Sequence, residues 1–299
     1  MLQNFREVLE KARQKGSVTV SVAVAQDLEV LAAVKAAQDA GLIRSILVGN
    51  VDLIKPMLSK VGLPLDTPLV HEEDDSQAAL IAVSLVKEGK ADILMKGMVN
   101  SGTFLKAVLN SEVGLRTGRL LSHLAVFEIP GEQKLAFHTD GGMNIAPTLE
   151  EKKDILINAL IALKALGIDH PNVAILTANE MVNSKMPATV DAQTLVTLNE
   201  KEHFTAGIIE GPIAMDVAAS KQAAEHKGIK SQIAGAVDLF VVPNIEAGNL
   251  VGKTLVYYAK AKNVGIVVGA THPIVMASRS ATAEEKLNAI ALACLAVPR

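Results

Sequence analysis

The residues best suited to chemistry lie near the end of the chain, in the stretch PIVMASRSATAEEK. Ser278 and Arg279 follow an apolar run typical of a buried strand, and Glu284 and Glu285 come shortly after them. An arginine at such a strand end, next to the start of a helix, makes a concentrated anion site, because guanidinium and free helix amides both bind negative oxygens. These residue types suit the binding and activation of an anionic substrate.

A structural explanation competes for part of this stretch. Thr282 and Glu285 are spaced as in a capping box, in which the threonine is the N-cap of a helix and the glutamate is its third residue. A cap does not require the Ser278–Arg279 pair that precedes it. From the residues alone, an active-site role and a structural role for this pair stay equally open.

A second segment, AGNLVGKT at residues 247–254, resembles a phosphate-binding loop. Such a loop needs free backbone amides before its helix begins. Here Asn249 is a plausible N-cap, and the apolar residues after it already recur at helical spacing. This spacing predicts that residues 252–254 lie inside a helix, where their amides are occupied. A P-loop nucleotide-binding protein is the alternative from a different functional class.

Cys294 is the only cysteine, which excludes an internal disulfide and suits a reducing cytosol. It shares a helical stripe with Leu287, Ile290, Ala291 and Leu295, so we expect a core residue rather than a covalent acyl carrier. The chain has no C-x-x-C, H-E-x-x-H or G-x-G-x-x-G pattern. No metal site is predicted.

Composition limits the class of protein. Of 299 residues 49% are apolar, enough for a large core, yet no apolar run reaches the ~18 residues of a membrane-spanning helix. The net charge is −3 and aromatic residues make up 3%, whereas nucleic-acid-binding proteins normally carry a basic face or stacking aromatics. The charged N-terminal segment is unlike a secretory signal. We expect a cytoplasmic protein that acts on small molecules, without nucleic-acid or membrane partners.

Short runs rich in Val, Ile and Leu alternate with helical stretches, which predicts a mostly parallel sheet with helices on both sides. Two runs separated by Pro130-Gly131 favour a hairpin, and the cluster of Gly, Asn and Pro at 140–154 is the best candidate hinge. We expect two α/β domains, residues 1–142 with 272–299 and residues 143–271. Helices after the hinge are predicted at 188–203, 215–227, 249–262 and about 283–296.

The C-terminal stretch resembles a signature of the phosphotransacylases, the phosphate acetyl/butyryltransferase family. The resemblance extends over most of the chain, in the same order, through ADILMKGMVNSGTFLKAVL, GRLLSHLAVFEIPG, FHTDGGMNIAPTLEEK, EGPIAMDVA and VDLFVVPNIEAGNLVGKTL. The length and the SHLAVFE stretch are most similar to the butyryl-specific members. The acetyl-specific members are otherwise close.

This resemblance implies a reversible reaction in which acyl-CoA and phosphate give acyl phosphate and CoA. It implies a fold similar to the isocitrate/isopropylmalate dehydrogenases, with two α/β domains around a cleft. No permanently bound cofactor is implied, because CoA or acyl-CoA is a substrate. A homo-oligomer, a dimer or larger, is also expected. Transfer of acetyl rather than butyryl groups is the nearer alternative.

The family motif aligns with Ser278 and Arg279 here. We expect Arg279 to bind the phosphoryl oxygens and Ser278 to donate a hydrogen bond near the sulfur or the carbonyl. Acetyl-branch relatives have an aspartate, proposed as the thiol base, seven residues after that serine. The matching residue is Glu285, which is a departure from the pattern and is also the capping residue, so Glu284 is a second candidate.

Further contacts to CoA and phosphate are expected from strand ends and helix starts, at Lys96, Thr103, Arg116, Arg119, Ser122, His123, Asp140 and Asn249. Lys96 ends a predicted strand, and Thr103 stands in the first turn of the next helix, where amides favour phosphate. His138 and Thr139 are second-rank candidates beside the hinge. Since the only thiol faces the core, direct transfer in a ternary complex is predicted.

Overall fold

The structure is a computed structural model that describes residues 2–277 and 281–298. Its contacts divide the chain into two compact units. Unit 1 is residues 120–263 with Leu2 and Gln3, and unit 2 is residues 4–119 with the described residues from Val264 onward. These boundaries differ from the expected 142/143 and 271/272.

Strand pairing explains the difference in boundaries. The predicted hairpin pairs with a strand from residues 239–241, so residues 122–139 belong with unit 1. The strand that ends at Val268 pairs with Ile274, so residues 264–271 join unit 2. A hinge predicted from Gly, Asn and Pro marks where the backbone turns, but long-range pairing decides which segments pack together.

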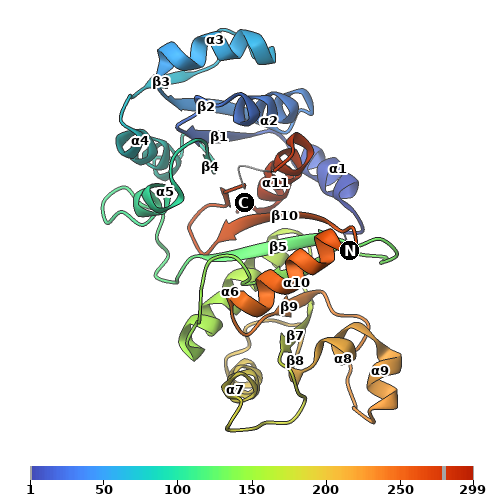
Figure 1. Ribbon diagram of the computed structural model, residues 1–299. Coiled ribbons are helices and arrows are strands. Elements are labelled where there is room, and N and C mark those ends of the chain that lie inside the picture. The colour runs from blue at the N-terminus through green and yellow to red at the C-terminus, as the bar shows by residue number, and fades with distance from the viewer. Residues whose placement is uncertain (1, 278–280, 299) are drawn as a thin grey trace. The chain divides into compact units, whose positions relative to one another are not determined.

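Unit 2 contains a sheet in the order β3-β2-β1-β4-β11-β10 (Figure 1). All neighbours in it are parallel except β10, which is antiparallel to β11. Its strands are β1 (Val18–Ala23), β2 (Ile43–Gly49), β3 (Leu69–His71), β4 (Ile93–Lys96), β10 (Lys262–Val268) and β11 (Ile274–Val275). β1 and β4 are buried along most of their length, as their Val- and Ile-rich sequences predict.

The helices of unit 2 cover both faces of this sheet. They are α1 (Phe5–Lys15), α2 (Leu28–Asp39), α3 (Val51–Val61), α4 (Asp75–Lys87), α5 (Ser101–Val108) and α11 (Ala283–Ala296). The chain moves outward from β1 to β3 and then returns past β1 to β4, so right-handed crossovers put α4 on the face opposite α2 and α3. The strand order therefore reverses between β1 and β4, the point at which open α/β sheets bind ligands.

Unit 1 has the strand order β5-β6-β9-β7-β8, in which only the β5–β6 hairpin is antiparallel. Its strands are β5 (Ser122–Glu128), β6 (Ala136–Thr139), β7 (Asn172–Leu176), β8 (Ile208–Ile213) and β9 (Leu239–Val241). Its helices are α6 (Leu149–Ala165), α7 (Pro187–Glu202), α8 (Met215–Ala219), α9 (Lys221–His226) and α10 (Ile245–Tyr257). The mixed α/β fold expected from the sequence is confirmed.

Two helix predictions in unit 1 are wrong in detail. α10 begins at Ile245, because Asn244 and not Asn249 is its N-cap and accepts a hydrogen bond from the amide of Ala247. The helix expected at 215–227 is two helices, since Ser220 is extended and caps α9. Residues 252–254 lie in the middle of α10, so they do not form a phosphate loop.

α11 packs against α1 and α2 in unit 2. Nine of its fourteen residues are buried, among them Cys294, which is 1% exposed. The expectation that Cys294 is a core residue is confirmed. In the part of the chain that the structure describes, no helix has the length and apolar character needed to cross a membrane.

At Gly97 the backbone of the turn after β4 is in close contact with the backbone at the end of β1. Its amide donates to the carbonyl of Ala23 at 2.9 Å, and the amide of Met98 donates to the carbonyl of Val24 at 2.9 Å. A Cβ at position 97 would lie 2.6 Å from the oxygen of Ala23 and closer still to that of Val24. Only glycine allows this approach of the two backbones.

We predict that Gly97→Ala lowers the free energy of unfolding by about 1–3 kcal/mol, the usual cost of forcing an extra methyl group into a packed site. Urea denaturation measures the change. Gly102→Ala is the matched control, because its Cβ would meet only the Asn100 side chain, at 3.3 Å. Equal stability of Gly97→Ala and Gly102→Ala would show that the backbones are not in close contact.

Candidate active-site residues in the two units

The carboxyl end of β4 combines a cation with a helix start. Lys96 is 8% exposed, and its Nζ donates to the carbonyl of Gly97 at 3.2 Å. α5 begins five residues later, and its N-cap Asn100 accepts from the amide of Gly102 at 2.8 Å. Thr103 is half-buried in the first turn of that helix. A lysine and a helix amino end at the reversal of strand order suit an anion.

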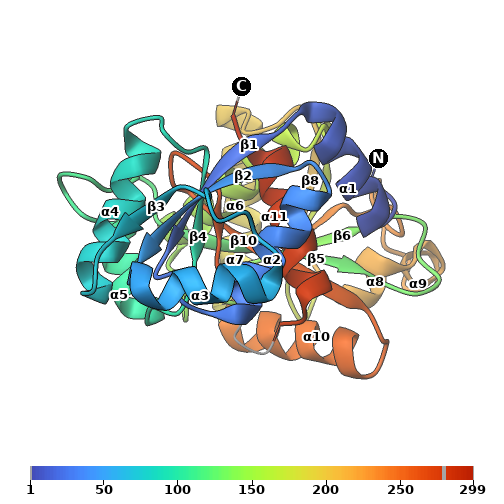
Figure 2. The same cartoon turned by 90° about the horizontal axis from the view of Figure 1, so that it is seen from above.

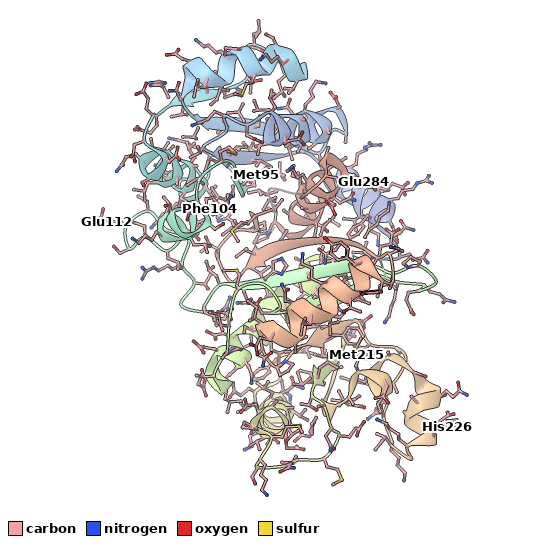
Figure 3. All side chains as sticks on the ribbon, in the orientation of Figure 1. Met95, Phe104, Glu112, Met215, His226 and Glu284 are labelled. Carbon is pink, nitrogen blue, oxygen red and sulfur yellow. The ribbon has the colours of Figure 1, made fainter. Side chains whose placement is uncertain are left out.

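α5 is fixed in place by apolar packing. Met95 on β4 and Phe104 on α5 are 1% and 0% exposed (Figure 3). Because β1 and β11 both run parallel to β4, with Ala23 beside Lys96 and Val275 beside Met95, the three strands end at the same edge. The chain therefore leaves β11 toward the edge that carries Lys96.

Ser278 and Arg279, the predicted catalytic pair, lie outside the described residues. The described chain ends at Ala277 and resumes at Ala281, just before α11. The capping box at this helix is confirmed. The hydroxyl of Thr282 accepts from the amide of Glu285 at 3.2 Å, and Oε2 of Glu285 accepts from the amide of Thr282 at 2.6 Å. One carboxylate oxygen of Glu285 thus stabilises the helix start.

Arg116 and Arg119, both expected to contact substrate, lie on the segment that leads out of α5. Arg116 is exposed, its Nε donates to the carbonyl of Leu109, and its backbone bridges to Ala270. These contacts place Arg116 toward the amino ends of β4 and β11, whereas Lys96 lies at the carboxyl end of β4. The structure therefore does not bring Arg116 and Lys96 together. Arg119 is half-buried, three residues further along.

Ser122, one of the expected substrate contacts, lies enclosed between β5 and α6. Its side chain is 0% exposed at the start of β5, and its Oγ accepts from Nδ2 of Asn158 at 3.1 Å. The same amide group of Asn158 donates to the carbonyl of Leu120 at 2.8 Å. This hydroxyl joins α6 to β5, and its contact with a substrate stays a prediction.

Asp140 holds the loop 140–144 in shape. Its Oδ1 accepts from the amides of Gly142 and Met143 at 2.8 and 2.9 Å, and its Oδ2 accepts from Nδ2 of Asn144 at 2.6 Å. Asn144 also donates to the carbonyl of Leu121 at 2.9 Å, which joins this loop to β5. With 2% exposure and these donors, Asp140 organises the loop, and its contact with a substrate stays a prediction.

His123 is next to this loop. A Cβ on Gly142 would lie 2.9 Å from its Nδ1, so the glycine backbone lies directly on the ring. Burial lowers the pKa of His123 below its ordinary value, although the charge of Asp140 partly offsets the effect. The lowered pKa favours the neutral ring at neutral pH. Thr139 supports it by donating from Oγ1 to the carbonyl of His123 at 2.9 Å.

Asn249, on α10, lies at the other side of the loop. Its Nδ2 donates to the carbonyl of Gly141 at 3.4 Å, and Gly248 packs so tightly on Gly141 that neither can carry a Cβ. The structure therefore gathers His123, Asp140 and Asn249 around one loop of unit 1. Sequence reasoning missed Asn144 and Asn158, which fix this arrangement; the Asn in GGMN was the one available signal.

His138 is a buried core residue. Its ring packs edge-on against Phe127, with centroids 4.9 Å apart, and lies 4.8 Å from the ring of Phe240. Neither ring nitrogen has a hydrogen-bond partner among the described residues. Burial lowers the pKa of His138 to about 4. Among the residues that the structure describes, no group of three His, Cys, Asp or Glu side chains could hold a metal ion.

We predict a pH-dependent contribution of His138 to stability. Between pH 6.5 and 4 the unfolded chain binds a proton at this side chain and the folded chain does not, so the free energy of unfolding falls as pH is lowered. The loss amounts to about 3 kcal/mol across this window. Urea denaturation at several pH values should show a smaller loss for His138→Leu. His226→Leu, on the exposed surface of α9, controls for the removal of a histidine (Figure 3). A loss as large in His138→Leu as in the wild type would contradict the assignment.

Comparisons with known proteins agree on one family. Residues 67–294 match the family described as phosphate acetyl/butaryl transferase. A phosphate butyryltransferase from Clostridium acetobutylicum is 46% identical, over 99% of this chain and 98% of that protein. A phosphate acetyltransferase from Rhizobium meliloti is 37% identical, over 99% and 94%.

A solved structure shows the same fold. The branched-chain phosphotransacylase from Enterococcus faecalis V583 superposes with a TM-score of 0.83 at 35% identity, covering 94% of this chain and 99% of its own. The similarity spans both units, and the motifs noted in the sequence fall within it. The chain therefore belongs to the phosphate acetyl/butaryl transferase family.

Proposed function

We propose that this protein is a phosphate butyryltransferase, which converts butyryl-CoA and phosphate reversibly into butyryl phosphate and CoA. The observation that carries the proposal is the near-complete match to relatives that bear this name, at 46% and 43% identity, whereas the acetyltransferase from Rhizobium meliloti is 37% identical. Acetyl transfer is the alternative. A branched acyl group is a further one, favoured by the name of the matching solved structure.

The reaction has two difficulties that protein groups must overcome. A thiol with a pKa of about 8.5 is only a few per cent thiolate at neutral pH, so a base must take its proton. The attacked carbonyl then develops negative charge beside a phosphate that is already negative, so positioned cations and donors are needed. The proposed mechanism uses no metal ion.

Arg279 and Ser278 are proposed to meet the second difficulty. Arg279 binds phosphoryl oxygens, and Ser278 donates to the carbonyl or sulfur. Two described features support this assignment. β11 leads toward the edge of the sheet where Lys96 and the start of α5 provide positive charge, and the segment ends at the amino end of α11, where helix amides favour anions.

Direct transfer in a ternary complex is proposed rather than a covalent acyl-enzyme. The only thiol is Cys294, which lies in the core and whose pKa burial raises to about 12. A thiol in this state is neither accessible nor ionised, and so it is a poor nucleophile. The isocitrate/isopropylmalate dehydrogenase-like fold and a cytoplasmic location also stay predictions, the former supported by the division into two α/β units.

The test of function is phosphate-dependent release of CoA from butyryl-CoA, followed with a thiol reagent, with acetyl-CoA and a branched acyl-CoA assayed in parallel. No metal or nucleotide is added. We expect the highest kcat/KM with butyryl-CoA and no burst of CoA without phosphate. Arg279→Ala should lower turnover at least ~100-fold, the scale of losing one oxyanion donor.

Arg6→Ala, on the exposed side of α1, is the control for removing an arginine. Wild-type turnover in Arg279→Ala would remove this residue from the mechanism. A stoichiometric burst of CoA without phosphate would replace direct transfer by an acyl-enzyme. Absence of turnover with every acyl-CoA would contradict the proposed activity.

The proposed base, Glu285, needs a variant that separates its two roles. Glu285→Gln retains the capping box, because glutamine also serves at this position, but cannot accept a proton. We predict that kcat falls at least ~100-fold while thermal stability is unchanged. Glu284→Gln, assayed in parallel, tests the second candidate for the base. If Glu285→Gln turns over at the wild-type rate, Glu285 is a helix cap only.

A further inference from the structure

The helices α6 and α11 begin with the same local sequence. Residues 148–152 read TLEEK and residues 282–286 read TAEEK, and each threonine–glutamate pair forms a capping box. The lysine is the fourth residue of its helix in both cases and is buried, with 8% exposure for Lys152 and 4% for Lys286. A buried lysine is unusual, and near the amino end of a helix its charge also opposes the helix dipole. Each of these lysines therefore needs a partner.

The two lysines have different partners. Nζ of Lys152 donates to Oδ2 of Asp191 at 2.7 Å, an ion pair that joins α6 to α7. Nζ of Lys286 instead donates to the backbone carbonyl of Ala281 at 2.7 Å. Oε2 of Glu29 is 3.9 Å from the same Nζ, too far for a hydrogen bond, and its side chain is 67% exposed, so this ion pair contributes little. Lys286 is thus directed at the chain that enters its own helix.

Lys286 and the cap together hold one peptide group from both sides. The carbonyl of Ala281 accepts from Lys286, and the amide of Thr282, in the same peptide group, donates to Oε2 of Glu285 at 2.6 Å. A capping box requires only the second of these contacts. The first adds a charged donor to a backbone oxygen, which makes a stronger hydrogen bond than a neutral donor does. The orientation of this peptide group is therefore set by α11 itself.

The peptide group lies at the edge of the sheet that carries Lys96. α11 packs against α2, which begins after the carboxyl end of β1 and has Glu29 in its first turn (Figure 2). β1 and β4 are parallel, so the ammonium of Lys286 stands at the same edge of the sheet in unit 2 as Lys96. Arg279 precedes Ala281 by two residues. A peptide group fixed here restricts where Arg279 can lie.

We propose that Lys286 is a positioning residue for the acyl transfer. By holding the carbonyl of Ala281 it fixes the direction in which the chain leaves Arg279, and so keeps the guanidinium in place for phosphoryl oxygens. This inference rests on the proposed function, which gives Arg279 that task. A binding group held in advance loses less freedom when the substrate arrives, and misplacing it by about 1 Å can cost ~100-fold in rate. With 4% exposure, Lys286 acts through Arg279 and is not a catalytic residue.

The test is a double-mutant cycle on the full-length protein, with inorganic phosphate and the acyl-CoA that the wild type transfers best. Lys286→Met retains the length of the side chain but removes the ammonium. We expect it to raise the KM for phosphate and to lower kcat/KM for phosphate at least ~10-fold, while the KM for acyl-CoA stays within about twofold. In the Arg279→Ala background the same substitution should change kcat/KM less than ~2-fold, because the group that it positions is already absent.

Lys152→Met is the matched control, since it removes a buried lysine from the same position of a helix with the same capping motif. It should lower thermal stability, because Asp191 loses its partner, and leave both KM values unchanged. Circular dichroism melts show whether each variant is folded, and Lys286→Gln gives the same comparison if Lys286→Met is not.

Two results would overturn the role of Lys286 while the proposed function stands. One is a folded Lys286→Met variant with wild-type kinetic constants. The other is additivity of Lys286→Met and Arg279→Ala in kcat/KM, because the two residues would then act independently. A wild-type protein that turns over no acyl-CoA would remove the proposed function and this inference together.

Discussion

The arrangement of unit 2 depends on the parallel pairing of β4 with β1 on one side and β11 on the other. Parallel strands bring their carboxyl ends to one edge, so groups that are 180 residues apart in sequence leave the sheet together. Lys96 and the start of α5 come from one strand end, and the Ser278–Arg279 stretch follows another. Gly97 allows the turn after β4 to contact β1 directly.

In unit 1 the candidate residues surround a loop that is held by hydrogen bonds to the carboxylate of Asp140. Asp140 accepts four hydrogen bonds from residues 142–144, and the glycines of the loop leave room for His123 and α10. These hydrogen bonds hold the loop in place beside His123, whose pKa is lowered by burial.

The protein has a small net charge. The chain carries a net charge of −3, so its anionic substrates must be bound by individual cations and helix ends rather than by a broad positive surface. Buried Lys96 fits this pattern, and Arg116 is held by contacts with Leu109 and Ala270. Cys294 is buried in the core, so the only thiol that takes part in the proposed reaction is that of CoA.

Local sequence determined the elements whose signals are contained in a few neighbouring residues. Spacing and side-chain type were enough to predict the Val- and Ile-rich strands and the Thr282–Glu285 cap. They also predicted that residues 252–254 are helical and that Cys294 lies on a buried stripe. The family motifs likewise indicated the reaction. The start of α10 was misplaced by four residues because two asparagines, Asn244 and Asn249, offer equally good caps.

Only the tertiary structure decided which polar side chains have partners of their own. Ser122 and Asp140 have the residue types of ligands, yet Asn158 and the 140–144 amides occupy them. The unit boundaries and the separation of Arg116 from Lys96 depend on pairings between distant strands. Hydrogen bonds and strand pairing over long sequence separations leave no local pattern, and for that reason the chain's sequence alone could not reveal them.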